Sequence, residues 1–348
     1  MIGGKLAVKK KRRKTVAAEH DPVGLDIGTA NIVVCRNGRT KVSARKTSNV
    51  FFTVPCREDT KTFLTGGNIK FFEKNDSLYI LGGPAEEFAL IMGGAARHPM
   101  EGGMLNLGEE EGVNVIHAIL SRLIPPAKNK NEPLWFSIPG KPIDSTATAM
   151  FNESIFKTFL ENLGYSPRPI NEGMAVVISE LSTGPATGIG ISIGGGMCNV
   201  CCSYLSIPVV TYSIQMGGDD IDKMVAGSVG ESPVKIKAIK ESELDLSALP
   251  KNSIEHGLHA CFDNLFSILT KSLGQVLNDS DNVPKLREAV PIVLSGGTIL
   301  TPGSRDKFAS MLQKVKLPFK VSDIILSKYP LYSTARGAYL MAADRENA

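Results

Sequence analysis

The sequence has 348 residues, of which 43% are hydrophobic, 21% charged and 6% aromatic. This composition is typical of a globular chain of about two domains and excludes a disordered or collagen-like protein. No apolar run approaches the ~18–20 residues of a membrane-spanning helix, and no apolar stretch follows the basic N-terminus as in a secretory signal. We therefore expect a cytoplasmic protein.

The charge of the chain is unevenly distributed. Residues 1–14 carry seven Lys or Arg and no acid, whereas the rest has 32 basic against 35 acidic residues. We expect residues 1–20 to form a disordered basic tail. The Lys9–Lys14 run has the charge to contact a membrane surface or an acidic partner. Because no aromatic residues are interleaved with it, no nucleic-acid partner is predicted.

The first half of the folded chain begins with two apolar strands. Residues 22–35 (PVGLDIGTANIVVC) form a strand, a tight turn and a second strand. After polar and Gly-rich connections, residues 134–138 form a buried strand. A helix then opens at Asp144 or Ser145 and ends at Gly164.

A second strand and helix complete this half. A short strand is predicted around residues 169–170 and a helix from Met174 to Leu181. Strands that alternate with helices indicate α/β layers. The stretch 182–188 (STGPATG) has the composition of a hinge between two halves.

The second half repeats this plan. A hairpin is predicted at 189–214 and a helix from Asp219. A long amphipathic helix spans roughly 252–277, and residues 291–294 form a buried strand. A final helix covers about 333–345.

The two halves echo each other in sequence. Residues 22–35 and 188–202 both read as an apolar strand, a Gly-rich reversal and a second apolar strand. Asp26 aligns with Ser192, 166 residues later, which is about half the chain. This spacing indicates a duplicated domain and not a short-period repeat.

Three cysteines fall in the second strand of the later echo. Cys198, Cys201 and Cys202 contain one C-x-x-C, but no second ligand pair accompanies them at the spacing of a zinc site. In a short apolar run, Cys behaves as a small buried hydrophobe. Core packing is therefore predicted, with reduced thiols.

Three Gly-rich turns follow apolar strands directly, at residues 28–31, 194–196 and 296–298. Glycine lets backbone N–H groups approach a phosphate closely, so such turns are candidate phosphate cradles. A single turn of this kind is more often only a tight reversal. The chain has no G-x-x-x-x-G-K-[ST] loop and no G-x-G-x-x-G opening a βαβ unit, which disfavours P-loop and Rossmann proteins.

Five segments in order resemble the actin-like ATPase superfamily, and most closely the bacterial actins of the MreB and MamK type. Taken singly, each segment is weak evidence, but five in the family's order are specific. The segments resemble the first phosphate loop, the connecting segment, the second phosphate loop, the segment after it and the adenosine turn: DIGTAN at 26–31, INEGMA at 170–175, IGGG at 193–196, GGDDID at 217–222 and LSGGT at 294–298.

The resemblance implies a duplicated α/β fold of the ribonuclease H-like type with a nucleotide cleft between the halves. Domain I is expected at 21–183, with a small subdomain at about 45–97, and helix 333–345 returns to it. Domain II is expected at 184–332, with a reduced upper subdomain at about 226–251.

The resemblance also implies the site. Asp26 would hold a water of a bound Mg²⁺, and Glu172 would orient or deprotonate the attacking water. ATP or ADP would lie between the halves. The residues implied to bind the nucleotide are Gly28, Thr29, Ala30, Asn31, Ser192, Gly194, Gly195, Gly196, Gly218, Asp219, Lys237, Gly296, Gly297, Thr298 and Ile299.

The chain departs from the family pattern at several of these positions. Ser192 stands where the second loop normally opens with Asp, and Ser carries no charge. Met197 replaces a Thr and Gly173 replaces a Pro. In the family's Glu-x-Ile-Lys stretch, Val234 replaces the Glu, while Lys237 is kept.

The function that the resemblance implies is nucleotide-dependent polymerisation into cytoskeletal filaments, with the chain itself as partner and with slow ATP hydrolysis. The alternative is a non-polymerising actin-like adaptor of the FtsA or PilM type, which Ser192 and Met197 favour. A small-molecule kinase of the same superfamily ranks third, because no sugar-binding signature is visible.

Overall fold

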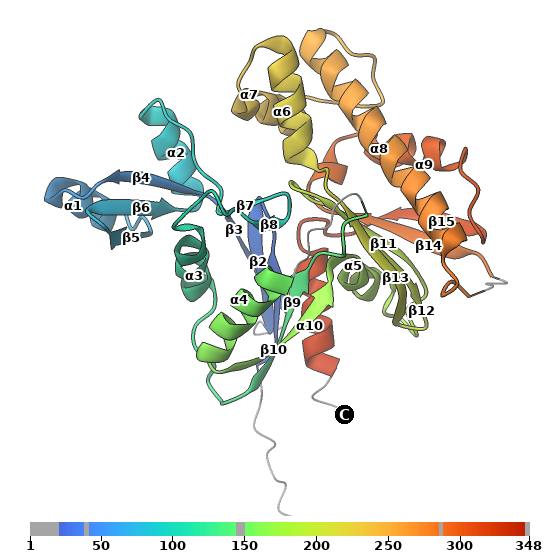
Figure 1. Ribbon diagram of the computed structural model, residues 1–348, viewed down its shortest axis with the longest axis horizontal. Helices are drawn as coiled ribbons and strands as arrows, with labels where there is room; N and C mark the ends of the chain where they lie inside the picture. Colours follow the sequence, from blue (N-terminus) through green and yellow to red (C-terminus); the bar gives the residue numbers. More distant parts are fainter. Residues whose placement is uncertain (1–20, 38–41, 144–149, 285–287, 345–348) are drawn as a thin grey trace, which may run out of the picture.

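The computed structural model describes residues 21–37, 42–143, 150–284 and 288–344, and these form two lobes (Figure 1). The predicted basic tail and the predicted opening of a helix at Asp144 or Ser145 lie outside these ranges. Each lobe is built on a five-stranded sheet. Within the described ranges, every helix is too short or too polar to cross a lipid bilayer.

The sheet of the first lobe has the order β10-β9-β1-β2-β3. Its first three strands form an antiparallel meander, and β9 and then β10 are added in parallel to β1. The strands are β1 (Val23–Ile27), β2 (Asn31–Asn37), β3 (Val42–Ser48), β9 (Glu132–Ile138) and β10 (Tyr165–Asn171).

The sheet of the second lobe has the same topology. It again begins with an antiparallel meander, to which two parallel strands are added on the side of the first strand. The order is β13-β12-β11-β14-β15. The duplicated α/β fold predicted from the echo is therefore confirmed. The strands are β11 (Gly188–Ile193), β12 (Cys198–Tyr204), β13 (Ile207–Ile214), β14 (Val290–Ser295) and β15 (Val321–Leu326).

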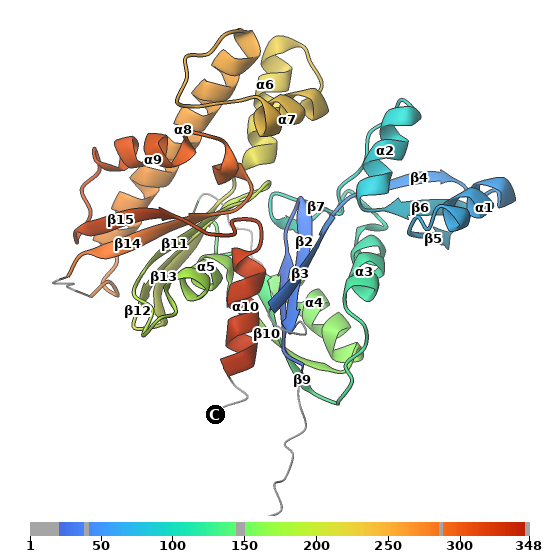
Figure 2. The ribbon, with the colours of Figure 1, turned by 180° about the vertical axis from the view of Figure 1, so that it is seen from behind.

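Two helices lie between the sheets, α5 (Glu172–Leu181) and α10 (Ser333–Asp344) (Figures 1 and 2). They approach backbone to backbone. A Cβ atom on Gly337 of α10 would lie 1.9 Å from the carbonyl oxygen of Ala175, and one on Gly24 of β1 would lie 2.1 Å from the backbone of α10. Glycine is thus required at both contacts, and α10 connects the first sheet to α5.

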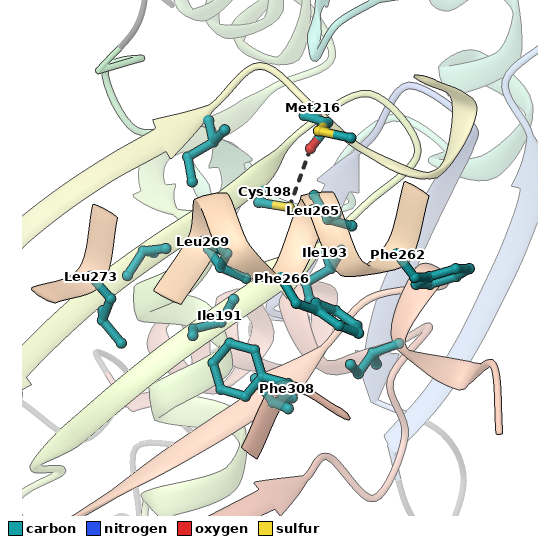
Figure 3. Packing of buried hydrophobic residues seen from close by; sticks show 14 of the residues in the cluster. Ile191, Ile193, Cys198, Met216, Phe262, Leu265, Phe266, Leu269, Leu273 and Phe308 are labelled. Atoms are coloured by element: carbon teal, nitrogen blue, oxygen red, sulfur yellow. Dashed lines mark hydrogen bonds between the residues drawn. The ribbon is translucent and has the colours of Figure 1, made fainter. Parts of the chain in front are cut away.

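The core of the second lobe forms between its sheet and the long helix α8 (Ser253–Asp279) (Figure 3). Cys198 is fully buried there, and its thiol donates to the carbonyl of Met216 at 3.2 Å. Cys201 and Cys202 are buried on the same strand, so the prediction of core cysteines on a strand is confirmed. Side chains that pack in this core include Ile191, Ile193, Leu265, Phe266, Leu269 and Phe308.

The segment between the first hairpin and β9 is richer in structure than the polar connections expected there. Its amphipathic helix α3 (Gly112–Leu123) buries Val115, Ile116, Ile119 and Leu120 against the first core. A three-stranded sheet of order β4-β6-β5 lies above, with its own small core. Its elements are β4 (Phe51–Pro55), α1 (Glu58–Gly66), β5 (Phe71–Lys74), β6 (Ser77–Leu81) and α2 (Gly83–Ile91).

The remaining helices are divided between the two lobes. Helix α4 (Met150–Asn162) packs on β10 of the first sheet. In the second lobe, α6 (Gly218–Val229) and α7 (Pro233–Ser242) form a compact pair above the sheet, beside the upper end of α8, and α9 (Ser304–Leu312) follows the short helix η1 (Thr298–Leu300). The exact domain boundaries remain predictions.

Candidate functional site

A cleft of about 470 Å³ lies between the two lobes, at the ends of β1, β11 and β14. Of the site residues predicted from the sequence, all but Ile299 line it. Ile299 is buried in the core of the second lobe. The structure thus brings together residues from six separate parts of the chain, while the role of each residue stays a prediction.

The two Gly-rich hairpin turns are closed by equivalent backbone hydrogen bonds. The N–H of Gly28 donates to the carbonyl of Asn31 at 2.9 Å, and the N–H of Gly194 donates to that of Met197 at 3.0 Å. Both turns follow the first strand of their sheets and face the cleft. Backbone amides in such turns form concave sites for anions.

Close packing at the second turn requires glycine. A Cβ atom on Gly195 would lie 2.7 Å from the carboxylate of Asp219, and one on Gly196 would lie 2.5 Å from Oγ1 of Thr29. Gly196 therefore touches a residue of the first turn. The two turns approach each other directly across the cleft.

A small hairpin of the first lobe, β7 (Met100–Glu101) and β8 (Met104–Leu105), also reaches the second turn. The N–H of Gly103 donates to Oγ1 of Thr29 at 3.0 Å, and the ammonium of Lys223 on α6 pairs with Glu101 at 2.5 Å. The Glu101–Lys223 ion pair joins the two lobes. It is exposed, so it adds little stability on its own.

Asp26 lies at the end of β1 and faces the cleft. The hydroxyl of Ser137 on β9 donates to its Oδ1 at 2.7 Å and accepts from the N–H of Ile27 at 3.1 Å. Burial raises the pKa of Asp26, while the bond from Ser137 acts in the opposite direction. The carboxylate is thus held in a fixed orientation by a neighbouring strand.

Glu172 is the first residue of α5, and the side chain of Asn171 caps this helix by accepting from the N–H of Met174 at 3.2 Å. The pKa of Glu172 is raised, first by burial and then by the negative charge of Asp26. Side-chain groups of Asn199 and Ser192 favour its charged form. A carboxylate with a raised pKa is a stronger base in its ionised form than one with an ordinary pKa.

The glycine that follows Glu172 explains how this carboxyl reaches the cleft. A Cβ atom on Gly173 would lie 2.6 Å from the backbone nitrogen of Cys201 on β12. The start of α5 therefore sits directly on the second sheet. This close contact accounts for Gly at a position where the family pattern has Pro.

Another part of the cleft wall is formed by the turn after β14. Gly296 has φ of +97°, and a Cβ atom there would lie 2.2 Å from the carbonyl oxygen of Ile193. Thr298 donates its hydroxyl to the carbonyl of Gly194 at 2.9 Å. The third turn is thus bonded to the second one, so they form one wall of the cleft.

Helix α7 contributes charged side chains to the cleft wall, of which only Lys237 is predicted from the sequence. Lys240 and Glu241 line the cleft as well. The ammonium of Lys240 is buried and lies 2.7 Å from both the carboxylate of Asp222 and the carbonyl of Gly218. Burial raises the pKa of Asp222 to about 6, in spite of the lysine.

Ser137, Asn199, Lys240 and Glu241 carry no motif that marks them in the sequence. The spacing of Lys237, Lys240 and Glu241, at i, i+3 and i+4 on one helix, is the single pattern that predicts a shared face. No cluster of three or more His, Cys, Asp or Glu side chains suited to a metal occurs in the part of the chain that the structure describes.

The family model described as volactin matches residues 22–343. The chain belongs to the volactin family. No curated protein matches the sequence. The match to the volactin family extends over both lobes and includes every residue that lines the cleft.

Solved structures similar to this volactin-family chain have the actin-like fold, which confirms the predicted resemblance. A MamK double helical filament has a TM-score of 0.71 at 17% identity, with 93% of this chain and 99% of the other covered. MreB 5 of Spiroplasma citri bound to AMPPNP has a TM-score of 0.68 at 17% identity, with 95% of this chain and 98% of the other covered. EutJ from Carboxydothermus hydrogenoformans has a TM-score of 0.54 at 15% identity, with 94% of this chain and 91% of the other covered.

Proposed function

We propose that the chain binds ATP in the cleft and uses it to control assembly into cytoskeletal filaments in the cytoplasm. One observation carries the proposal: two Gly-rich turns closed by equivalent hydrogen bonds, one from each lobe, face a single cleft that is also lined by Asp26 and Glu172. A polyphosphate bound between two such turns contacts both lobes at once. Its binding therefore favours the arrangement in which the lobes are closed.

The residues present are suited to Mg²⁺ held through water. Mg²⁺ keeps several of its waters and takes one or two carboxylates in phosphate sites. Asp26 supplies one fixed carboxylate, and the hydroxyl of Ser192 faces the same cleft. When bound, the ion would neutralise charge on the phosphates.

The hydrolytic role is assigned to Glu172. A carboxyl with a raised pKa accepts a proton from water more readily than one with an ordinary pKa, provided that it is ionised at the working pH. The amides of the two turns hold phosphate oxygens without carrying charge themselves. With Ser192 in place of a second carboxylate, turnover is expected to be slow.

Assembly is proposed by similarity of fold. The similar MamK structure is a double helical filament, and the MreB 5 structure contains AMPPNP. Head-to-tail contacts that do not close into a ring generate filaments. Loss of the γ-phosphate would weaken the closed arrangement and permit disassembly.

The test uses the purified full chain with ATP and Mg²⁺, followed by sedimentation, negative-stain microscopy and phosphate release. Polymers are expected with ATP and with AMPPNP, and Glu172→Gln should form polymers while releasing phosphate at least tenfold more slowly. Glu161→Gln, an exposed carboxyl on α4, serves as the matched control. Persistently monomeric protein across salt and nucleotide conditions contradicts the filament proposal.

A second candidate is a non-polymerising actin-like adaptor, and Ser192 is the observation that favours it. Such a protein would bind ATP without releasing phosphate. Ser192→Asp distinguishes the two, because a second carboxylate in the cleft is expected to raise turnover in an ATPase and to leave an adaptor inactive. Calorimetric titration with ATP provides the accompanying measurement of binding.

A further inference from the structure

Asn199 is a fully buried amide near the start of β12, and its cross-strand neighbour lines the cleft. In the ladder between β11 and β12 it stands opposite Ser192. At the equivalent place of the first sheet, Val33 stands opposite Asp26. The second lobe thus has a polar side chain where the matching position of the first lobe is apolar.

One end of the Asn199 amide joins the two lobes. Its Oδ1 accepts from the N–H of Gly140 at 2.8 Å, and Gly140 follows β9 of the first sheet. Gly140 is held a second time, because the hydroxyl of Ser213 on β13 donates to its carbonyl at 2.8 Å. Gly140 is thus bonded independently to β12 and to β13 of the second sheet.

The other end of the amide has no partner among the described residues. Nδ2 of Asn199 is buried and donates no hydrogen bond. A buried donor without a partner costs about 1–3 kcal/mol. Because buried polar groups in native structures are nearly always hydrogen-bonded, this donor is a candidate to bind an acceptor beside it.

Glu172 is the acceptor that this donor faces. Gly173 places the start of α5 against Val200 and Cys201, the residues that directly follow Asn199. Asn199 also acts on the pKa of Glu172 in the direction of the charged form. Ser192, which faces Glu172 as well, is the cross-strand neighbour of Asn199.

We propose that Asn199 is a positioning residue that holds the carboxylate of Glu172 through Nδ2 while Oδ1 is anchored on Gly140 of the opposite lobe. The proposal rests on the proposed ATP hydrolysis. The orientation of Glu172 then depends on the contact between Gly140 of the first lobe and β12 of the second. A movement of β9 relative to β12 displaces the amide and with it the direction in which the carboxylate points.

The experiment compares Asn199→Asp with Ser213→Ala in the full chain. Asn199→Asp keeps the Oδ1 acceptor for Gly140 but replaces the donor that faces Glu172 with an acceptor. We expect its kcat for ATP to fall at least tenfold, with KM changed less than twofold. Ser213→Ala removes the other bond to Gly140 without touching Glu172, so its kcat is expected to stay within twofold of the unaltered chain.

Asn199→Ser provides a second variant with no new charge, and it is expected to show the same loss of kcat at unchanged KM. Wild-type kcat in either folded variant, a rise in KM alone, or an equal loss in Ser213→Ala overturns the positioning role. If the unaltered chain binds ATP but releases no phosphate, the proposed hydrolysis fails, and this role fails with it. The two failures are thus told apart by the unaltered chain.

Discussion

The backbone contact between α10 and α5 makes a strong prediction about Gly337. Replacement of Gly by Ala inside a helix normally stabilises a protein by about 0.5–1 kcal/mol, because Ala loses less conformational freedom on folding. At Gly337, however, the added Cβ atom would lie 1.9 Å from the carbonyl oxygen of Ala175. The helices must therefore move apart by about 1 Å or more.

The magnitude follows from the two opposing effects. Overpacking costs typically about 1–3 kcal/mol, and the upper end applies because the obstacle is backbone and not a flexible side chain. After the helical gain of Ala is subtracted, Gly337→Ala should lower the free energy of unfolding by about 2 kcal/mol. For lobes of this size, the melting temperature should fall by roughly 4–8 °C.

The matched control is Gly227→Ala in α6, where an added Cβ atom has nothing within 4 Å. This variant should gain about 0.5–1 kcal/mol and melt slightly above the unaltered chain. Thermal melting followed by circular dichroism, at one pH and without nucleotide, measures both. A Gly337→Ala protein that melts at or above Gly227→Ala would refute the reasoning.

Three further predictions concern the charged groups of the cleft. Lys240→Met should lower the free energy of unfolding by about 3 kcal/mol, because it leaves the buried Asp222 without its cation. A denaturant titration measures this loss, and the double variant with Asp222→Leu should recover most of it. Glu241→Gln should reduce any preference for ATP over 2′-deoxy-ATP in calorimetric titration, because a carboxylate that lines the cleft can accept hydrogen bonds from ribose hydroxyls; an unchanged ratio would contradict this. The pKa of Glu172 rises from 4.5 to about 8 on folding. Between those pH values the folded chain therefore keeps a proton that the unfolded chain has lost. Because of this difference, the melting temperature of the nucleotide-free protein should fall from pH 6 to pH 8. Glu172→Gln should flatten this fall, and equal slopes in the two proteins would show that the pKa is not raised.

The parts of the fold that the sequence predicts are those with continuous apolar runs. β1, β11 and β14 are buried along almost their whole length, so apolar residues dominate them between turn residues. Helix α8 shows a regular apolar stripe over many turns. Strand β3, by contrast, is an edge strand that is exposed over most of its length, and it carries no apolar alternation.

The residues of the candidate site likewise fall into those predicted from the sequence and those found only in the structure. Glycine turns after apolar strands are visible in sequence because the chain reversal demands a particular residue type. Ser137, Asn199 and Lys240 are ordinary residues of a strand or helix, and their importance comes from what lies opposite them in space. Lys240, for example, acquires its role from Asp222, 18 residues away on another helix. Contacts of this kind follow from tertiary packing and are not encoded in local spacing.

The equivalence of the two sheets has a consequence for the origin of the asymmetry in the cleft. A symmetric pair of halves would set two identical side chains face to face at the centre, and two carboxylates there would repel each other. Here one half offers an acid backed by an aliphatic neighbour, Asp26 with Val33, and the other a hydroxyl backed by an amide, Ser192 with Asn199. The chemical difference between the two halves thus depends on two cross-strand pairs. Exchanging the pairs between the sheets would test whether the halves are interchangeable at this position.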